Sequence, residues 1–182
     1  MDTNKDGIVN DDDRTKIGKG MPDWTYGITF SADWKGFDAN LFFQGALGND
    51  VYDFAMRGDI PAMNRPAWIL GRWIGEGTSN RIPRMTNNNP NQNWRSSDLY
   101  VKNGSFLRLK TAQLGYTLPA GLLRSVLIKN VRVYVAGENL LTFTKYDGFD
   151  PEMVSGGYTT IGIDRGIYPQ ARTITVGASI TF

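Results

Sequence analysis

The residues best suited to chemistry lie at the start of the chain, in the segment DTNKDGIVNDDD. Oxygen-bearing side chains recur there at short intervals and a glycine permits a sharp turn, as in loops that wrap oxygen ligands around Ca²⁺. The predicted ligands are the side chains of Asp2, Asn4, Asp6, Asn10 and Asp13 and the main-chain carbonyl of Ile8. Asp13 is shorter than the glutamate usual at the last position, and the segment is also typical of an acidic turn that caps a helix over residues 11–17. Both interpretations stay open, and the filled ligand positions favour calcium.

A second acidic group lies in KYDGFDPEM, which contains Asp147, Asp150 and Glu152. Two carboxylates at a suitable separation can hydrolyse a glycosidic bond. No neighbouring residues are placed to hold a sugar ring, however, so we interpret this group as solvated charges on a turn-forming loop.

Tryptophans in polar, irregular stretches are the third candidate feature. Trp68, Trp73 and Trp94 could stack on sugar rings, but loop tryptophans more often anchor the loop itself or a protein partner. Large aromatic side chains bury much area at low rotamer cost, so we expect Trp68, Trp73 and Tyr158 to contact a partner protein.

Several activities are disfavoured by what the chain lacks. It contains neither cysteine nor histidine, which removes thiolate metal sites, cysteine nucleophiles and the commonest general base. The net charge is +2 and the basic residues are scattered, so no nucleic-acid-binding patch is predicted. We therefore expect neither enzymatic activity nor a nucleic-acid partner.

The elements that must position these loops are predicted to be β-strands. Apolar and polar residues alternate with the two-residue period of a strand over residues 24–34, 37–44, 105–118, 130–140 and 172–182. The tight connection at Lys35 and Gly36 predicts a hairpin. In the third segment the apolar set shifts by one position, which predicts a bulge near Thr111. The fold class is therefore all-β with antiparallel strands.

The connections between these strands alternate between short and long. Short links fall at residues 34–37 and 119–130, whereas residues 49–104 and the segment after residue 140 form long, irregular loops. Outer-membrane barrels keep periplasmic turns short and extracellular loops long, and they cross the bilayer without an apolar helix. The aromatic residues near strand ends fit interfacial girdles. We expect an extracellular loop over residues 1–22 and transmembrane barrel strands with their loops over residues 23–182.

Four stretches together resemble a known family: GMPDWTYGITFSADWKGFDANLFFQGALGNDVYD, SSDLYVKNGSFLRLKTAQLGYTLP, NVRVYVAGENLLTFTKYDGFDPE and DRGIYPQARTITVGASITF. They are similar to the C-terminal segment of the SusC/RagA-like TonB-dependent outer-membrane transporters of Bacteroidetes. The resemblance implies about five strands of a barrel of the 22-stranded class, in outer-membrane lipid. It also implies import of a glycan or peptide beneath a SusD-like surface lipoprotein, with coupling to the TonB complex through an upstream region absent from this sequence.

The last residue and the alternative function complete the expectations. Phe182 ends an alternating strand on an aromatic residue, which resembles the assembly signal of outer-membrane barrels; a girdle aromatic is the alternative. The runner-up function is a free-standing, calcium-dependent carbohydrate-binding module built as a β-sandwich, whose core would be the apolar strand faces.

Overall fold

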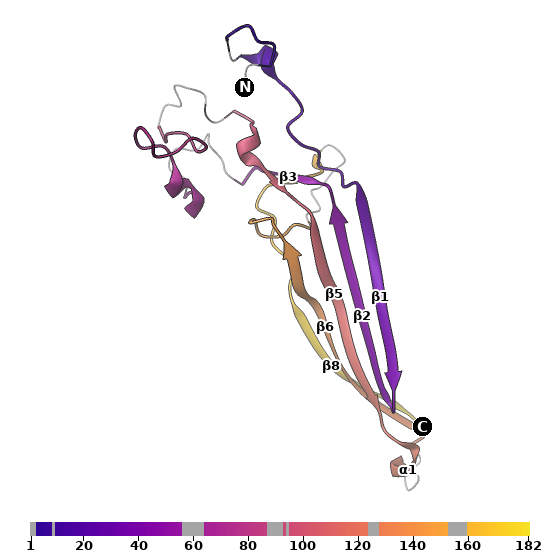
Figure 1. Ribbon diagram of the computed structural model, residues 1–182. Coiled ribbons are helices and arrows are strands. Elements are labelled where there is room, and N and C mark those ends of the chain that lie inside the picture. Colours follow the sequence, from indigo (N-terminus) through magenta and orange to yellow (C-terminus); the bar gives the residue numbers. More distant parts are fainter. Residues whose placement is uncertain are drawn as a thin grey trace.

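The computed structural model describes residues 3–8, 10–55, 64–86, 93, 95–123, 128–152 and 160–182. Its main feature is a long, antiparallel sheet of five strands in the order β1-β2-β5-β6-β8 (Figure 1). The strands are β1 (Trp24–Trp34), β2 (Phe37–Leu47), β5 (Phe106–Thr117), β6 (Asn130–Thr144) and β8 (Thr173–Thr181). Each predicted strand is therefore confirmed, and the all-β, antiparallel fold class with them.

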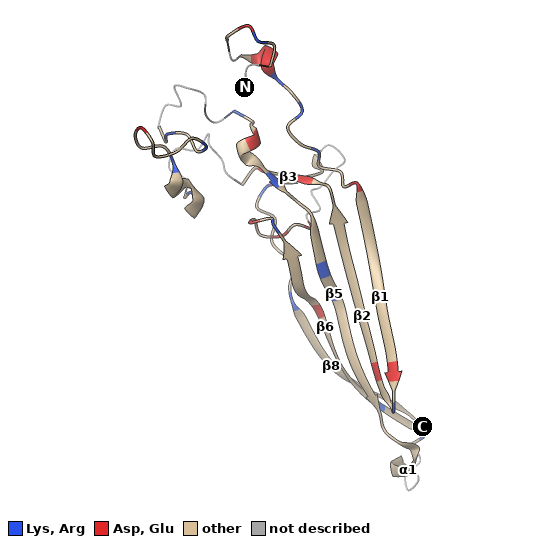
Figure 2. Ribbon diagram, in the orientation of Figure 1, with Lys and Arg blue, Asp and Glu red and all other residues tan. Residues whose placement is uncertain are grey.

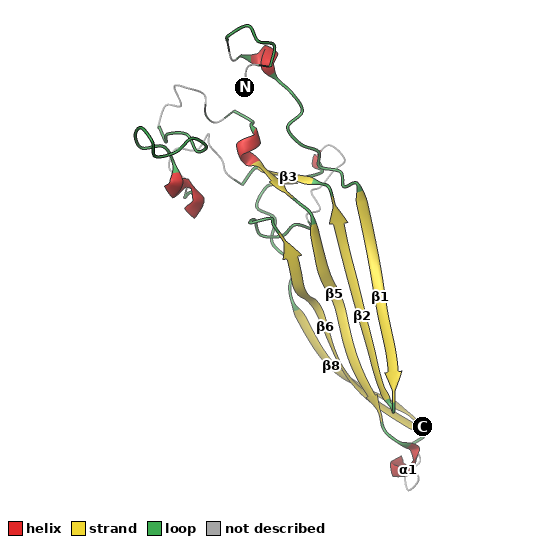
Figure 3. Ribbon diagram, viewed as in Figure 1, coloured by secondary structure: helices red, strands yellow, loops and turns green. Residues whose placement is uncertain are grey.

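The long and short connections lie at opposite ends of this sheet. The N-terminal segment and the loops after β2 and β6 lie at one end, whereas the β1–β2 turn, the C-terminus and helix α1 (Ala120–Leu123) lie at the other (Figure 1). Figure 3 shows how little helix accompanies the strands. No helix among the described residues is long and apolar enough to cross a membrane.

Register keeps the apolar side chains of all five strands on one face. Directly opposed residues share a face of an antiparallel pair, and Ile28 opposes Phe43 while Val135 opposes Val176. The predicted hairpin is confirmed: Trp34 opposes Phe37, and Lys35 and Gly36 close the turn with φ values of 48° and 88°. Such positive values match the right-handed twist of the strands.

A bulge in β5 preserves this arrangement. The register against β2 shifts between Phe42 and Phe43, where Lys110 is the extra residue of β5. Beyond Lys110, Leu114 returns to the face of Leu109 because one unpaired residue restores the two-residue period. The predicted bulge near Thr111 is confirmed.

The apolar face is open instead of forming a core. Phe30 is 58% exposed and Val176 is 79% exposed, and in the described part of the chain no second layer covers these side chains. Figure 2 shows that charged residues gather at the strand ends and in the loops, while the middle of β1 and β2 carries none. A water-soluble sandwich would bury this face, so the described structure does not support that alternative.

The long loops contain more regular structure than the sequence predicted. A second sheet of order β4-β3-β7 joins β3 (Asp50–Asp53) antiparallel to β4 (Val101–Asn103) and parallel to β7 (Ile163–Asp164). Strands this short contain too few residues for an alternating pattern to be recognised. The expectation of irregular loops is therefore wrong for these segments.

Three short 3₁₀ helices complete the described elements: η1 (Asp11–Asp13), η2 (Ala67–Gly71) and η3 (Asp98–Tyr100). The buried cluster of the loop end consists of Ile69 and Tyr100. Five partly buried side chains pack against this cluster: Tyr52, Trp68, Ile82, Met85 and Leu99.

At the opposite end, Gly115 allows an ion pair to span β5 on the polar face. The guanidinium of Arg132 on β6 donates to both carboxylate oxygens of Asp38 on β2, with an Nε···Oδ1 distance of 2.8 Å. A Cβ at Gly115 would lie 2.5 Å from Nη2 of Arg132. A larger residue at position 115 would therefore displace the ends of both side chains.

Gly115→Ala should therefore displace the tips of the Asp38 and Arg132 side chains, lengthen their ion pair and lower the melting temperature of the assembled full-length protein. Thermal unfolding in detergent measures the effect. Gly121→Ala is the matched control, because a Cβ there meets nothing within 4 Å. Equal melting temperatures for the two variants would contradict this account.

Candidate functional site

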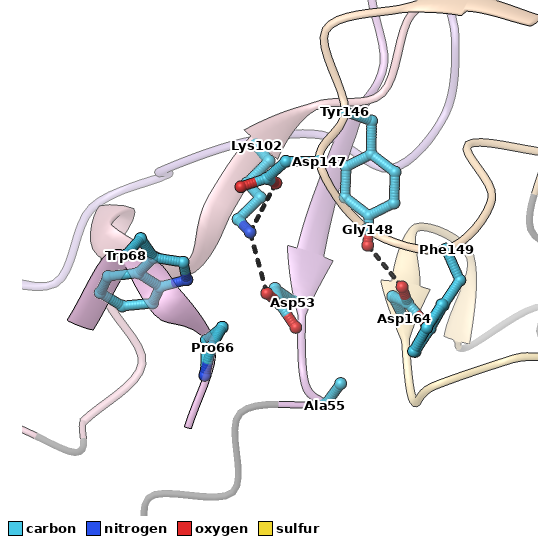
Figure 4. Close-up of a pocket in the computed structure, with 10 residues that line it drawn as sticks. All are labelled: Asp53, Ala55, Pro66, Trp68, Lys102, Tyr146, Asp147, Gly148, Phe149 and Asp164. Atoms are coloured by element: carbon cyan, nitrogen blue, oxygen red, sulfur yellow. Dashed lines mark hydrogen bonds and ion pairs between the residues drawn. The ribbon is translucent and has the colours of Figure 1, made fainter. Parts of the chain in front are cut away.

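Five segments of the sequence surround a cavity of about 240 Å³ at the loop end. They are the ends of β3 and β4, the segment that begins η2, the loop after β6, and β7 (Figure 4). The lining residues are Asp53, Ala55, Pro66, Trp68, Lys102, Tyr146, Asp147, Gly148, Phe149 and Asp164.

Lys102 is the central charge of this cavity. Its ammonium lies 3.0 Å from a carboxylate oxygen of Asp53 and 2.6 Å from one of Asp147 (Figure 4). Burial alone would lower the pKa of Lys102, but hydrogen bonds to Asp147 and Asp53 outweigh burial and raise it. Lys102 therefore stays charged and ties β4 to both β3 and the loop after β6.

Tyr146 and Asp164 form the inner wall. The Tyr146 hydroxyl donates a hydrogen bond to Asp164, and both side chains are buried. The other oxygen of Asp164 accepts the backbone N–H of Gly166 at 2.7 Å. Burial first, and then the hydrogen bond to Asp164, raise the pKa of Tyr146 far above its usual range. The phenol is thus a neutral donor that fixes the loop.

Two aromatic rings lie on opposite sides of the cavity, Trp68 on η2 and Phe149 on the loop after β6 (Figure 4). The indole Nε1 of Trp68 is buried and has no hydrogen-bond partner. Trp73 follows in the same segment, where its backbone N–H donates to the carbonyl of Ile82, and it is not among the lining residues. The other predicted contact residues, Trp94 and Tyr158, lie outside the described residues.

The acidic loop after β6 is held by basic residues of β5. Arg108 is 3% exposed, and its guanidinium donates to Asp150 and, at 2.8 Å, to Glu152. Lys110 donates to the same Glu152 carboxylate. The interpretation of Asp150 and Glu152 as solvated charges is therefore wrong, since both are ion-paired and Asp150 is buried.

The groups around Asp150 keep its carboxylate charged although it is buried. Burial would raise its pKa, but the Arg108 guanidinium and the backbone N–H groups of Gln170 and Glu152 together lower it. Sequence reasoning missed both Arg108 and Lys102. The sequence did indicate that each is a basic residue in or beside a strand with an apolar pattern. It could not indicate the acidic partners, because they lie more than 40 residues away in the sequence.

The N-terminal segment adopts the geometry of a capping turn. One carboxylate oxygen of Asp13 accepts the backbone N–H of Thr3 at 2.6 Å and the other accepts that of Asn10 at 2.9 Å. The bond from Asn10 is the main cause of a lowered pKa for Asp13. Among the described residues, no group of three or more His, Cys, Asp or Glu side chains is arranged to hold a metal ion. Asp2 lies outside the described residues, so the calcium site stays a prediction.

Comparison with known proteins identifies relatives of the whole chain. No protein-family profile matches it. Over its whole length it is 36% identical to TonB-dependent receptor P3 of Formosa agariphila. It is also 29% identical, again over its whole length, to TonB-dependent receptor SusC of Bacteroides thetaiotaomicron. The chain is a homologue of SusC-like TonB-dependent receptors.

Solved structures agree with this relationship. The present chain superposes on a chain of the RagAB peptide importer in its closed-closed state with a TM-score of 0.77 and 29% sequence identity. The match covers 96% of the present chain and 19% of the RagAB chain. For the open-open state the TM-score is 0.69, with 27% identity and coverages of 89% and 17%. The present chain also spans only 18% of the length of P3 and 17% of the length of SusC. The resemblance to SusC/RagA-like transporters is confirmed.

In the full-length receptor, Arg108→Ala should release the loop after β6 because it leaves the Asp150 carboxylate buried without its guanidinium. Removing one partner of a buried ion pair costs about 3–5 kcal/mol. Limited proteolysis within residues 145–172 measures the release. Lys110→Ala is the matched control, since Glu152 keeps Arg108 and a partly exposed pair contributes at most about 1 kcal/mol. Equal cleavage of the two variants would contradict the assignment.

The pH dependence of this protection has a defined sign. Because the folded pKa of Asp150 is depressed, its contribution to stability is fully present above the ordinary carboxyl pKa and is lost as the pH falls through the lower folded value. Wild-type protection should therefore persist at pH 5 and above.

Proposed function

We propose that this chain is part of an outer-membrane, TonB-dependent importer of a large nutrient. The observation that carries the proposal is the apolar face that continues across all five strands without a covering layer in the described structure. Hydrocarbon is the environment that suits such a face, and the strands provide the backbone hydrogen bonds that a membrane requires. Homology to TonB-dependent receptors supplies the class of transporter.

The edges of the sheet support a larger barrel. In the described structure β1 pairs with β2 alone and β8 with β6 alone. Open sheet edges do not occur in the hydrocarbon of a membrane, and in water they favour pairing with another chain. We propose that further strands of the full-length protein close the sheet into a barrel of the 22-stranded class. The polar face, with the Asp38–Arg132 pair, would then line the lumen, and the long loops would face outward.

The proposed partner is a SusD-like surface lipoprotein above these loops, contacted through Trp68, Trp73 and Tyr158. Coupling to the TonB complex would use parts of the protein outside this chain. The substrate is a glycan or a peptide; the related RagAB assembly is named a peptide importer. A free-standing carbohydrate-binding sandwich is not favoured, because its core would have to be the face that is open here.

Deletion of the full-length gene should abolish growth on one class of glycan or peptide as sole nutrient, and complementation should restore it. The complemented protein should fractionate with the outer membrane and co-purify with a lipoprotein. Alanine replacement of Trp73, which lies outside the cavity, should weaken that co-purification. An isolated chain that is monomeric, soluble without detergent and cooperatively folded would overturn the barrel proposal.

Phe182 provides a separate test of assembly. Its side chain is 74% exposed, and losing it removes about 1.5–3 kcal/mol of burial in lipid, which a large barrel should survive. As an assembly signal, however, it should matter before the barrel forms. Deleting Phe182 should sharply reduce the amount of receptor in the outer membrane and leave the melting temperature of the assembled fraction nearly unchanged. Normal assembly with a lower melting temperature would make Phe182 a girdle residue only.

We also propose that the N-terminal segment binds Ca²⁺ through the side chains of Asp2, Asn4, Asp6, Asn10 and Asp13 and the carbonyl of Ile8. This proposal is supported by the sequence, which has an oxygen-bearing group at each ligand position of a calcium-binding loop. Calcium titration of the full-length receptor should protect this segment from proteolysis, and Asp6→Ala should remove the protection. Protection that is identical with chelator would leave the capping turn as the correct interpretation.

A further inference from the structure

The loop after β6 does not stay above the ends of the strands. Its residue Glu152 accepts hydrogen bonds from Lys110 at 2.8 and 2.9 Å, and Lys110 lies four residues (106 to 110) beyond Phe106, where β5 begins. At about 3.3 Å per residue, this contact lies about 13 Å below the end of the strand. The loop therefore descends along the sheet.

It descends on the polar face. Arg108 opposes Thr142 on β6. The apolar neighbours Leu107 and Leu109 project to the opposite face, because successive side chains of a strand alternate. The Arg108 guanidinium donates to Thr142 at 2.9 Å and to Glu152 at 2.8 Å. The loop thus contacts the polar face of two neighbouring strands.

Burial indicates that the loop covers this part of the face. On β1 the polar-face residues Thr29 and Ser31 are exposed. Arg108, by contrast, is 3% exposed and Asp150 is 4% exposed, although both are charged. A long charged side chain on an open face would extend its charged end into water. The loop therefore forms a second layer over β5.

The return of the chain to β8 keeps the loop at this depth. Thr173, the first residue of β8, opposes Glu138, which lies six residues (138 to 144) before β6 ends at Thr144. Shortly before Thr173, the backbone N–H of Gln170 donates to the carboxylate of Asp150 at 2.9 Å. The outgoing and returning parts of the loop are thus bonded to each other below the end of β6.

We infer that residues 150–152 and 170 form a fixed ledge inside the lumen, which limits the size of the solute that passes along β5 and β6, and that Arg108 positions this ledge. The inference rests on the proposed barrel, because only closure of the sheet turns the polar face into a lumen. A layer of chain on the inner wall narrows the passage at that height. Arg108 is the positioning residue because its guanidinium holds both Asp150 and Glu152.

Cysteine labelling of the full-length receptor in intact cells tests the size limit. The present chain contains no cysteine, so a receptor with any other cysteine changed to serine can carry a single reporter. Gln113→Cys places the reporter on the polar face of β5, three residues (110 to 113) beyond Lys110 and opposite Asn40. Two reagents are added from outside: N-ethylmaleimide, which is small, and a maleimide on a long polyethylene glycol chain.

With the ledge intact, N-ethylmaleimide should label Gln113→Cys and the polymer reagent should not. Arg108→Ala removes the guanidinium that holds Asp150 and Glu152, so labelling by the polymer reagent should rise to the level of the small reagent. Asp150→Asn keeps the shape of the side chain and weakens the same contact. It should give part of this rise, and it serves if Arg108→Ala does not assemble.

Arg132→Ala is the matched control, because it breaks an ion pair with Asp38 on the same face at the opposite end of the sheet. It should leave Gln113→Cys closed to the polymer reagent. Lys16→Cys, at an exposed residue before β1, should react with both reagents in every variant.

Two results would overturn the inference: polymer labelling of Gln113→Cys with the ledge intact, or no gain of polymer labelling with Arg108→Ala and Asp150→Asn. A purely structural role for Arg108 would lower the melting temperature without changing which reagent enters. The proposed function is judged separately by outer-membrane location and by uptake in the complemented strain. A receptor that passes those tests and fails this one refutes the ledge alone.

Discussion

Register across the five-stranded sheet is the constraint on which the rest of the structure depends. A slip of one residue in any strand would move its whole apolar set to the polar face. The β1–β2 hairpin fixes the first pair through a turn with positive φ values at Lys35 and Gly36. At the centre, β5 keeps the alignment only because Lys110 bulges between two apolar runs of opposite phase. The continuous apolar face is therefore a product of turn geometry, the bulge at Lys110 and the facing irregularity of β6, where Asn139 and Leu140 are left unpaired between Glu138 and Leu141.

Charge is distributed so that this face stays apolar. The ion pairs that involve the long strands lie on the polar side: Asp38 with Arg132 at one end, and Arg108 with Asp150 and Glu152 at the other. Arg108 is the more demanding case because its guanidinium is almost fully buried. Buried charges persist only when they are paired and hydrogen-bonded, so the loop after β6 is fastened where its carboxylates meet β5.

Paired charges also hold the loops together at the loop end of the sheet. Lys102 joins two carboxylates from separate segments, and the mixed β4-β3-β7 sheet supplies backbone hydrogen bonds to loops that would otherwise be independent. The N-terminal segment is included, since the backbone N–H of Asp50 donates to the carbonyl of Lys19 at 2.7 Å. The N-terminal segment and the two long loops are thus joined by hydrogen bonds and ion pairs at this end of the sheet.

The sequence by itself determined the five strands, their antiparallel arrangement, the hairpin and the bulge. Each of these depends on neighbouring residues and on the two-residue period of a strand. It also separated short from long connections, and its resemblance to SusC/RagA-like transporters pointed to the relatives that comparison confirmed. The tertiary structure alone decided the second sheet, whose strands are too short to carry a period. It also decided the pairing of Arg108 with Asp150, 42 residues apart, and the convergence of Trp68, Lys102 and Asp147. Local periodicity cannot encode such contacts, since the identity of a buried partner depends on where the whole chain brings it.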